Sequence, residues 1–244
     1  MQLAFNILSW GAWSPAYQDS AAWKQWRKAT RTDALDERAP TLTQVPSMQR
    51  RRFSRLTKMM LHAAFTAAPD SHYRTVFASR HGELNRTIVL LENVLAQQPL
   101  SPTGFSQSVH NTASGLHGIV TKNTQASTSI AAGSETLAQA MYEAYAQLQA
   151  SEQPLLLVYG DDPVPPIYDQ YTDELEYPLA LALLLSRSDV TTTSPIARLA
   201  IDTTTAATDT PLCYGQLLQA LATGTDLRGE IAHQQWQLQV EHGT

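Results

Sequence analysis

The sequence is poor in cysteine, in charged residues and in long apolar runs. Its one cysteine, Cys213, excludes an intrachain disulfide framework and suits a reducing cytosol. Charged residues make up 16% of the chain and the formal net charge is −5, so the basic stripe of a nucleic-acid-binding protein is missing. The longest apolar run, 179–185, is far shorter than the roughly 20 residues that a membrane helix needs, and no basic leader precedes the first apolar residues. We therefore expect a cytoplasmic protein without membrane insertion and without a nucleic-acid partner.

The usual signals of a bound group are also missing. The sequence contains no glycine-rich phosphate-binding loop and no cluster with metal-ligand spacing. Asp161 and Asp162 alone offer too few oxygen ligands for a hard cation. Gly133-Ser134 lacks the remaining residues of a G-x-S-x-G nucleophile motif. We expect neither a cofactor nor a metal.

What is present is an alternation of short apolar strands with amphipathic helices. The 244 residues, 43% of them apolar, are enough for one substantial core. The patterns predict strands over 5–10, 73–79, 127–132, 155–159, 179–186, 196–202 and 232–240. They predict helices over 21–28, from 47 onward, and over 84–97, 111–120, 134–149 and 212–222, with a loop over 29–46. This alternation predicts a layered α/β fold in one domain, 1–244.

Two segments in the middle of the chain carry the most informative pattern. The first, 101–115, places Ser-Pro a few residues before an Asn-x-x-x-Gly helix start, and the second, 127–134, is a short strand that ends in Gly-Ser. From about 101 to 159 the chain resembles the N-terminal half of β-ketoacyl synthases, which belong to the thiolase-like superfamily. A shorter subgroup shares further motifs, which this chain shows at 5–13, 50–56, 108–111 and 158–161.

That subgroup is similar to the chain-length factors that pair with a catalytic ketosynthase in type II polyketide systems, notably those making aryl polyene pigments. The resemblance implies a thiolase-like layered α/β fold, truncated relative to a full ketosynthase, and it is clearest over 1–186. Residues 187–244 then either extend the same sheet or replace part of the missing half.

The resemblance places the family's nucleophilic cysteine at Ser134, 23 residues after Asn111. A thiol attacks a thioester far better than a hydroxyl, because a useful fraction of it ionises near neutral pH. Ketosynthases also bring two histidines from their C-terminal half, whereas this chain has only His233 and His242 after Ser134, in other sequence contexts. The resemblance therefore implies a ketosynthase-like subunit without condensing activity.

The resemblance also implies where the subunit acts. In ketosynthases the segment after Ser-Pro reaches the partner's acyl pocket and helps to close its far end, and Thr103, Gly104 and Phe105 match that segment. A bulky side chain there limits how many extender units fit, through steric exclusion alone. The implied partners are a full-length catalytic ketosynthase, in a heterodimer, and transiently an acyl carrier protein.

Several interpretations stay open from the sequence alone. Ser134 and Asn111 each suit a plain helix start that satisfies backbone donors. Ser134 is also the nucleophile of an alternative function, an independent serine acyltransferase or thioesterase. A third possibility is a homodimeric scaffold that recruits a carrier protein without touching the tunnel. The arginines of 50–55 fit either a solvated, ion-paired helix face or a contact with a carrier protein.

Overall fold

The computed structural model describes residues 1–28, 36–69, 72–172, 177–190, 194–203 and 210–241. Eight strands in these ranges form a single sheet in the order β3-β2-β4-β5-β1-β6-β8-β7. Only β2 with β3 and β2 with β4 pair in parallel, and the other neighbours described are antiparallel. The strands are β1 (Gln2–Trp13), β2 (Arg74–Ala78), β3 (Ser127–Ile130), β4 (Leu155–Asp161), β5 (Leu179–Arg187), β6 (Ala197–Asp202), β7 (Leu227–Ile231) and β8 (Gln234–Val240).

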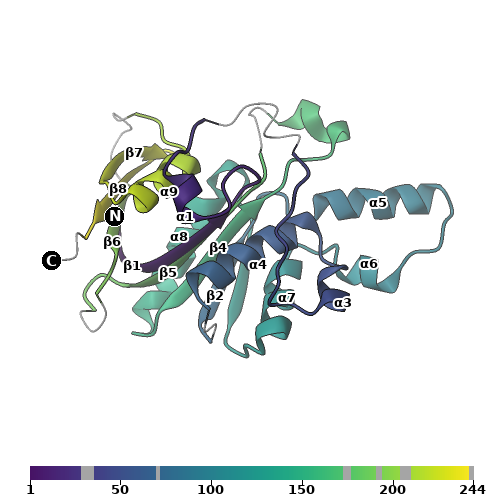
Figure 1. Ribbon diagram of the computed structural model, residues 1–244, viewed down its shortest axis with the longest axis horizontal. Helices are drawn as coiled ribbons and strands as arrows, with labels where there is room; N and C mark the ends of the chain where they lie inside the picture. The colour runs from purple at the N-terminus through teal and green to yellow at the C-terminus, as the bar shows by residue number, and fades with distance from the viewer. Residues whose placement is uncertain (29–35, 70–71, 173–176, 191–193, 204–209, 242–244) are drawn as a thin grey trace.

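Helices cover both faces of this sheet, as Figure 1 shows. The α-helices are α1 (Ser20–Trp23), α3 (Ser47–Arg50), α4 (Arg55–Ala67), α5 (Leu84–Leu95), α6 (Pro102–Ser106), α7 (Thr112–Thr121), α8 (Thr136–Gln149) and α9 (Tyr214–Thr223). Two short 3₁₀ segments are η1 (Gly133–Glu135) and η2 (Pro166–Tyr171). The predicted α/β layer structure is confirmed.

The core lies in two layers, one on each face of the sheet. On one face α8 and α9 pack on the strands through residues such as Leu137, Met141 and Leu217, all at most 1% exposed. On the other face α4 contributes Met59 and Leu61, both fully buried. Because β4 and β5 are covered on both faces, they read as continuous apolar runs.

Several predicted boundaries are wrong. The helix predicted from Ser47 onward is two helices, because the chain leaves helical geometry after α3 and Ser54 begins α4, with its hydroxyl accepting from the Thr57 backbone N–H at 3.0 Å. The first strand, predicted over 5–10 with Gly11 closing it, begins at Gln2 and continues through Gly11 to Trp13. A Cβ at Gly11 would lie 2.4 Å from a backbone oxygen of α4, so glycine here allows the close approach of helix and sheet.

The other predictions differ in extent. The predicted helix 21–28 is confined to α1, and the predicted helix 134–149 begins only after η1. The sequence patterns missed α6 and β7. Part of the predicted loop, 29–35, lies outside the described residues. Beyond residue 186, β6, β8 and β7 add three strands to the same sheet, and α9 packs on the face that α8 covers.

Candidate functional site

Ser134 lies at the junction where the edge strand β3 leads through η1 into α8. Its side chain is exposed, and neither η1 nor α8 has a side-chain cap bond at its N-cap residue. The local hydrogen bonds come from Thr136 instead, whose hydroxyl donates to the Gly133 carbonyl at 2.7 Å and accepts from the Ala132 N–H at 2.9 Å. The interpretation of Ser134 as a plain N-cap is therefore wrong.

Ser134 lines a cleft of about 610 Å³. The cleft is bordered by the end of β4, the start of α9 and the turn between β7 and β8. Thr103, Gly104, Phe105 and Asn111 do not line it. Within this one chain, the structure therefore does not bring Ser134, the predicted nucleophile position, and the predicted tunnel segment together.

A half-buried carboxylate, Asp161 at the end of β4, also lines this cleft. Its Oδ1 accepts from the Ser79 hydroxyl and the Arg80 N–H, both at 2.8 Å, and its Oδ2 accepts from the Tyr159 hydroxyl at 2.6 Å. Burial raises the pKa of the Asp161 carboxyl, and burial also raises the pKa of Tyr159. These bonds occupy both carboxylate oxygens, so Asp161 fixes the β4 end to the segment after β2.

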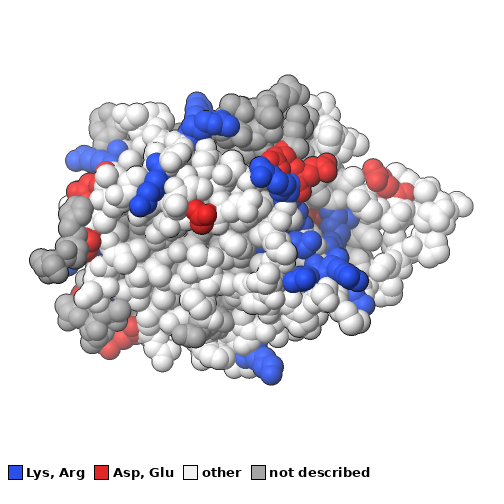
Figure 2. Space-filling model, viewed as in Figure 1, with Lys and Arg blue, Asp and Glu red and all other residues white. Residues whose placement is uncertain are grey.

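The next residue, Asp162, pairs with Arg55, one of the arginines of 50–55 for which the sequence left two roles open. Its Oδ2 accepts from the Arg55 Nε at 3.1 Å, and Arg50 donates to the Leu42 carbonyl at 3.3 Å. Arg55 and Arg50 thus serve the structure of the chain itself. Arg51 and Arg52 are exposed. Lys and Arg side chains gather near α3 and the base of α5 (Figure 2).

The histidines give Ser134 no hydrogen-bonded base in the part of the chain that the structure describes. His110 contacts the Ser79 carbonyl through Nε2 at 2.8 Å. His117 is buried on α7 between Phe65 and Phe77, where burial lowers its pKa to about 4. His233 lines the cleft, but its Nδ1 pairs with Glu230 at 3.3 Å and its imidazole is 88% exposed. His242 lies outside the described residues.

The sequence pattern did not predict the position of His233, because the apolar alternation over 232–240 reads as one strand. The structure has a β7–β8 hairpin there, and Ala232 and His233 form its turn with φ of 50° and 60°. A two-residue hairpin turn requires such positive φ, which Asn-Gly or Asp-Gly normally signals in a sequence. Ala232-His233 is neither of these dipeptides, so the sequence gives no sign of the turn.

Asn111 stands at the N-cap of α7, as expected, but its side chain makes no cap bond. The prediction that Asn111 satisfies the first backbone donors is therefore wrong. Thr112, the next residue, directs its hydroxyl to the Val109 carbonyl at 2.8 Å.

The predicted tunnel segment forms α6, which lies beside the projecting helix α5 (Figure 1). We call α5 and α6 together, residues 84–106, the arm. The Ser101 hydroxyl accepts from the Gly104 N–H at 3.2 Å, and a Cβ on Gly104 would lie 3.6 Å from Leu90 of α5. Gly104 thus faces α5, whereas Thr103 is exposed and Phe105 is 64% exposed.

The arm presents an apolar surface to solvent in this chain. None of the twelve residues of α5 is buried. The exposed large apolar side chains of the arm and its flanks are Val89, Leu91, Val94, Leu95, Leu100, Phe105 and Val109. Apolar side chains gathered in this way mark an interaction surface more often than chance exposure does.

No group of three or more metal-ligating side chains exists within the described ranges. No helix in these ranges has the length and apolarity to cross a membrane.

Comparisons with known proteins agree with the sequence motifs. The family "Beta-ketoacyl synthase, N-terminal domain" matches residues 23–239. A ketosynthase in complex with its chain length factor, from Xenorhabdus doucetiae, is 29% identical with a TM-score of 0.76, and the match covers 97% of this chain and 99% of that chain. The ishigamide ketosynthase/chain length factor is 15% identical with a TM-score of 0.65, covering 81% and 65%.

A type II acyl-carrier protein in complex with its ketosynthase is also similar, at 12% identity and a TM-score of 0.62, covering 82% of this chain and 68% of that chain. No curated protein matches. The predicted thiolase-like ketosynthase fold is confirmed, and so is the resemblance to ketosynthases and chain-length factors. The chain belongs to the β-ketoacyl synthase family, whose N-terminal domain it matches over most of its length.

Proposed function

We propose that this protein is a chain-length factor: a non-catalytic subunit that pairs with a full-length ketosynthase and shapes its acyl tunnel in type II polyketide synthesis. Aryl polyene synthesis is the pathway class we favour, from the motif resemblance. The observation that carries the proposal is the exposed apolar arm, in which Phe105 of α6 is 64% exposed. A cytoplasmic location is part of the proposal, and the single cysteine supports it.

The nucleophile position supports the absence of condensing activity. Condensation needs an acylated nucleophile and donors that stabilise the developing oxyanion and enolate. Ser134 supplies a hydroxyl in place of a thiol, and no histidine of the described residues hydrogen-bonds to it. A hydroxyl without a base within hydrogen-bond reach is a weak nucleophile.

Two surfaces support a large protein partner. The arm exposes apolar side chains that a partner would bury, and obligate interfaces of this kind bury about 2,000 Å² or more. The strand β3 lies at the edge of the sheet, with only β2 as its described neighbour. An unpaired edge strand can add a strand from another chain. Because β3 leads directly to Ser134, such pairing would place the partner next to the cleft.

The finer proposal for the arm is that Phe105 forms the far wall of the partner's tunnel. Its ring is mostly exposed in this chain, while Gly104 faces Leu90 of α5. Substitution of Phe105 therefore changes the volume offered to a partner and leaves the α5–α6 packing intact. Substitution of Gly104 changes that packing as well.

We also propose an acyl carrier protein as a partner. It would bind the exposed turn that contains Arg51 and Arg52. Arg51 and Arg52 present two guanidinium groups on a chain whose net charge is −5. Exposed arginines suit an acidic surface, and mutation of such rim charges changes mainly the association rate and its salt dependence. Arg50 and Arg55 do not belong to this surface, because internal contacts occupy them.

The test is reconstitution with a candidate catalytic ketosynthase and carrier protein. We expect the two chains to co-purify, and we expect product length to depend on the presence of this chain. Phe105→Ala should lengthen the products and Phe105→Trp should shorten them, with the complex retained. Tyr171→Ala, which removes an aromatic ring of similar exposure from η2, is the matched control and should change nothing. Two chains that migrate as separate monomers at micromolar concentration would refute the proposal.

The same experiment separates the alternatives. A serine acyltransferase would be labelled by a fluorophosphonate probe in the absence of a partner, and Ser134→Ala would abolish the labelling. A homodimeric scaffold would associate with itself and leave product length unchanged in both Phe105 variants.

A further inference from the structure

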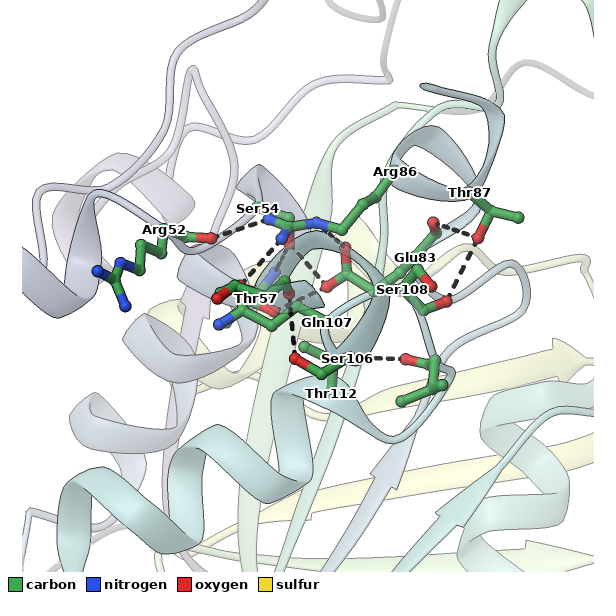
Figure 3. A network of polar contacts seen from close by, with 12 residues as sticks. Arg52, Ser54, Thr57, Glu83, Arg86, Thr87, Ser106, Gln107, Ser108 and Thr112 are labelled. Carbon is green, nitrogen blue, oxygen red and sulfur yellow. Dashed lines mark hydrogen bonds and ion pairs between the residues drawn. The ribbon is translucent and has the colours of Figure 1, made fainter. Parts of the chain in front are cut away.

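The arm is attached to the rest of the chain through its first turn. Since no residue of α5 is buried, apolar packing contributes little to its orientation. The attachments are polar and lie near the start of the helix (Figure 3). Asn85 donates to the Pro163 carbonyl at 2.9 Å, and Thr87 donates to the Ser108 carbonyl at 3.3 Å.

The buried carboxylate of Glu83 anchors this turn to α4. Its Oε1 accepts from the Ser54 hydroxyl at 2.7 Å and from the Thr57 hydroxyl at 2.8 Å. Burial raises the pKa of Glu83, and the two hydroxyl groups act against that shift by favouring the carboxylate. Ser54 and Thr57 belong to the N-terminus of α4, so Glu83 joins the starts of α4 and α5.

Arg86 connects this anchor to α6. Its Nη1 donates to the Gln107 Oε1 at 2.9 Å, its Nη2 donates to the Arg52 carbonyl at 2.9 Å, and its Nε lies 3.8 Å from the Glu83 Oε2. Gln107 is the C-cap of α6, two residues after Phe105. A guanidinium is planar and rigid, so three contacts from one group hold the three segments in a defined arrangement.

We propose that Arg86 is a positioning residue for chain-length control: it holds α6 at a defined angle to the body and so sets how far Phe105 reaches into the partner's tunnel. This inference rests on the proposed function. It assigns the control of product length to two features, the size of Phe105 and the orientation that Arg86 and Gln107 give to α6. Loss of the Arg86–Gln107 contact should broaden the product-length distribution, because a freer α6 places the ring at several depths.

The experiment compares Arg86→Ala and Gln107→Leu, which remove the same contact from its two sides. Arg74→Ala is the matched control, since the Arg74 guanidinium also donates two hydrogen bonds that join separate segments, to the backbone carbonyls of Gln147 and Gln153 at the C-terminal end of α8. Gln107→Glu keeps an acceptor for Arg86 and should behave as the unaltered chain does.

Two readouts are measured for each variant. The first is hydrogen exchange of the α6 amides in this chain alone, which should accelerate about tenfold in Arg86→Ala and Gln107→Leu, as expected from the loss of a hydrogen bond to a charged group. The second is the product-length distribution with the ketosynthase present, which should broaden in the same two variants and stay narrow in the other two.

The outcomes separate the inference from the proposed function. Unchanged α6 exchange in Arg86→Ala and Gln107→Leu would overturn the positioning role, and so would an unchanged product distribution in a complex that forms normally. If Arg74→Ala altered both readouts to the same degree, the effect would be one of general stability and the inference would be wrong. Failure of the unaltered chain to bind any ketosynthase would instead refute the proposed function, while the exchange result would still decide whether Arg86 orders α6.

Discussion

His117 makes the stability of this protein sensitive to mild acid. The imidazole lies on α7 between two phenylalanine rings, 1% exposed, and its Nε2 is buried with no hydrogen-bond partner among the described residues. Burial lowers its pKa from 6.5 to about 4, because the charged form would lose its hydration there. The prediction is tested by lowering the pH and comparing the loss of unfolding free energy in the unaltered chain with that in His117→Leu.

The sign follows from the direction of the shift. In the unfolded chain the imidazole takes up a proton near its ordinary pKa, whereas the folded chain resists protonation down to about pH 4. Stability is therefore complete above the ordinary pKa and is lost as the pH falls through it. A shift of about 2.5 units corresponds to about 3 kcal/mol in total, of which about 2 kcal/mol is lost between pH 8 and pH 5.

The assay is urea unfolding of both proteins at these two pH values. We expect the unaltered chain to lose about 2 kcal/mol more than His117→Leu on acidification. At pH 8 the substitution should cost little, because leucine fills a similar volume and removes an unsatisfied polar atom. Burial also lowers the pKa of His62, but this histidine is present in both proteins, so its contribution to the pH dependence cancels in the comparison. Equal losses in the two proteins would refute the argument.

Three further predictions concern the nucleophile position, one tight contact and one ion pair. Ser134→Ala should leave product length and complex formation unchanged, and fluorophosphonate should not label the unaltered chain; labelling would restore the acyltransferase hypothesis. Gly11→Ala should lower the free energy of unfolding by about 3 kcal/mol, because the new Cβ meets the backbone of α4. In the same urea assay, Gly115→Ala on α7 should raise the free energy of unfolding by about 0.5 kcal/mol, because its new Cβ meets nothing within 4 Å. Asp162→Ala leaves the part-buried Arg55 without its carboxylate and should cost about 3 kcal/mol at neutral pH, with thermal unfolding as the measurement; a midpoint within one degree of the unaltered chain would contradict this.

The elements with strong local signals were predictable from the sequence. The apolar runs of β4 and β5 and the helical periodicity of α8 depend on burial patterns that repeat every few residues, so a short window contains them. The family was predictable for a related reason, since its motifs are short and keep their spacing along the chain.

Elements without such signals were missed. α6 is five residues long and has no buried residue, and β7 is joined to β8 by Ala232-His233, a turn without glycine. The break before α4 depends on a cap at Ser54 that a continuous apolar stripe conceals. In each case the element depends on a contact or a backbone angle, and the spacing of apolar residues along the sequence does not indicate either.

The sequence by itself determined the layered α/β class and the family, because both depend on residue type and spacing. It also predicts a hydroxyl, that of Ser134, at the position of the family's thiol. Only the tertiary structure decided that Ser134 is exposed and has no hydrogen-bonded histidine among the described residues, and that no residue of α5 is buried. The same holds for Arg86, which contacts Glu83, Arg52 and Gln107. Arg52 and Gln107 lie 34 and 21 residues away along the chain, and only the tertiary packing brings them within hydrogen-bond reach of Arg86.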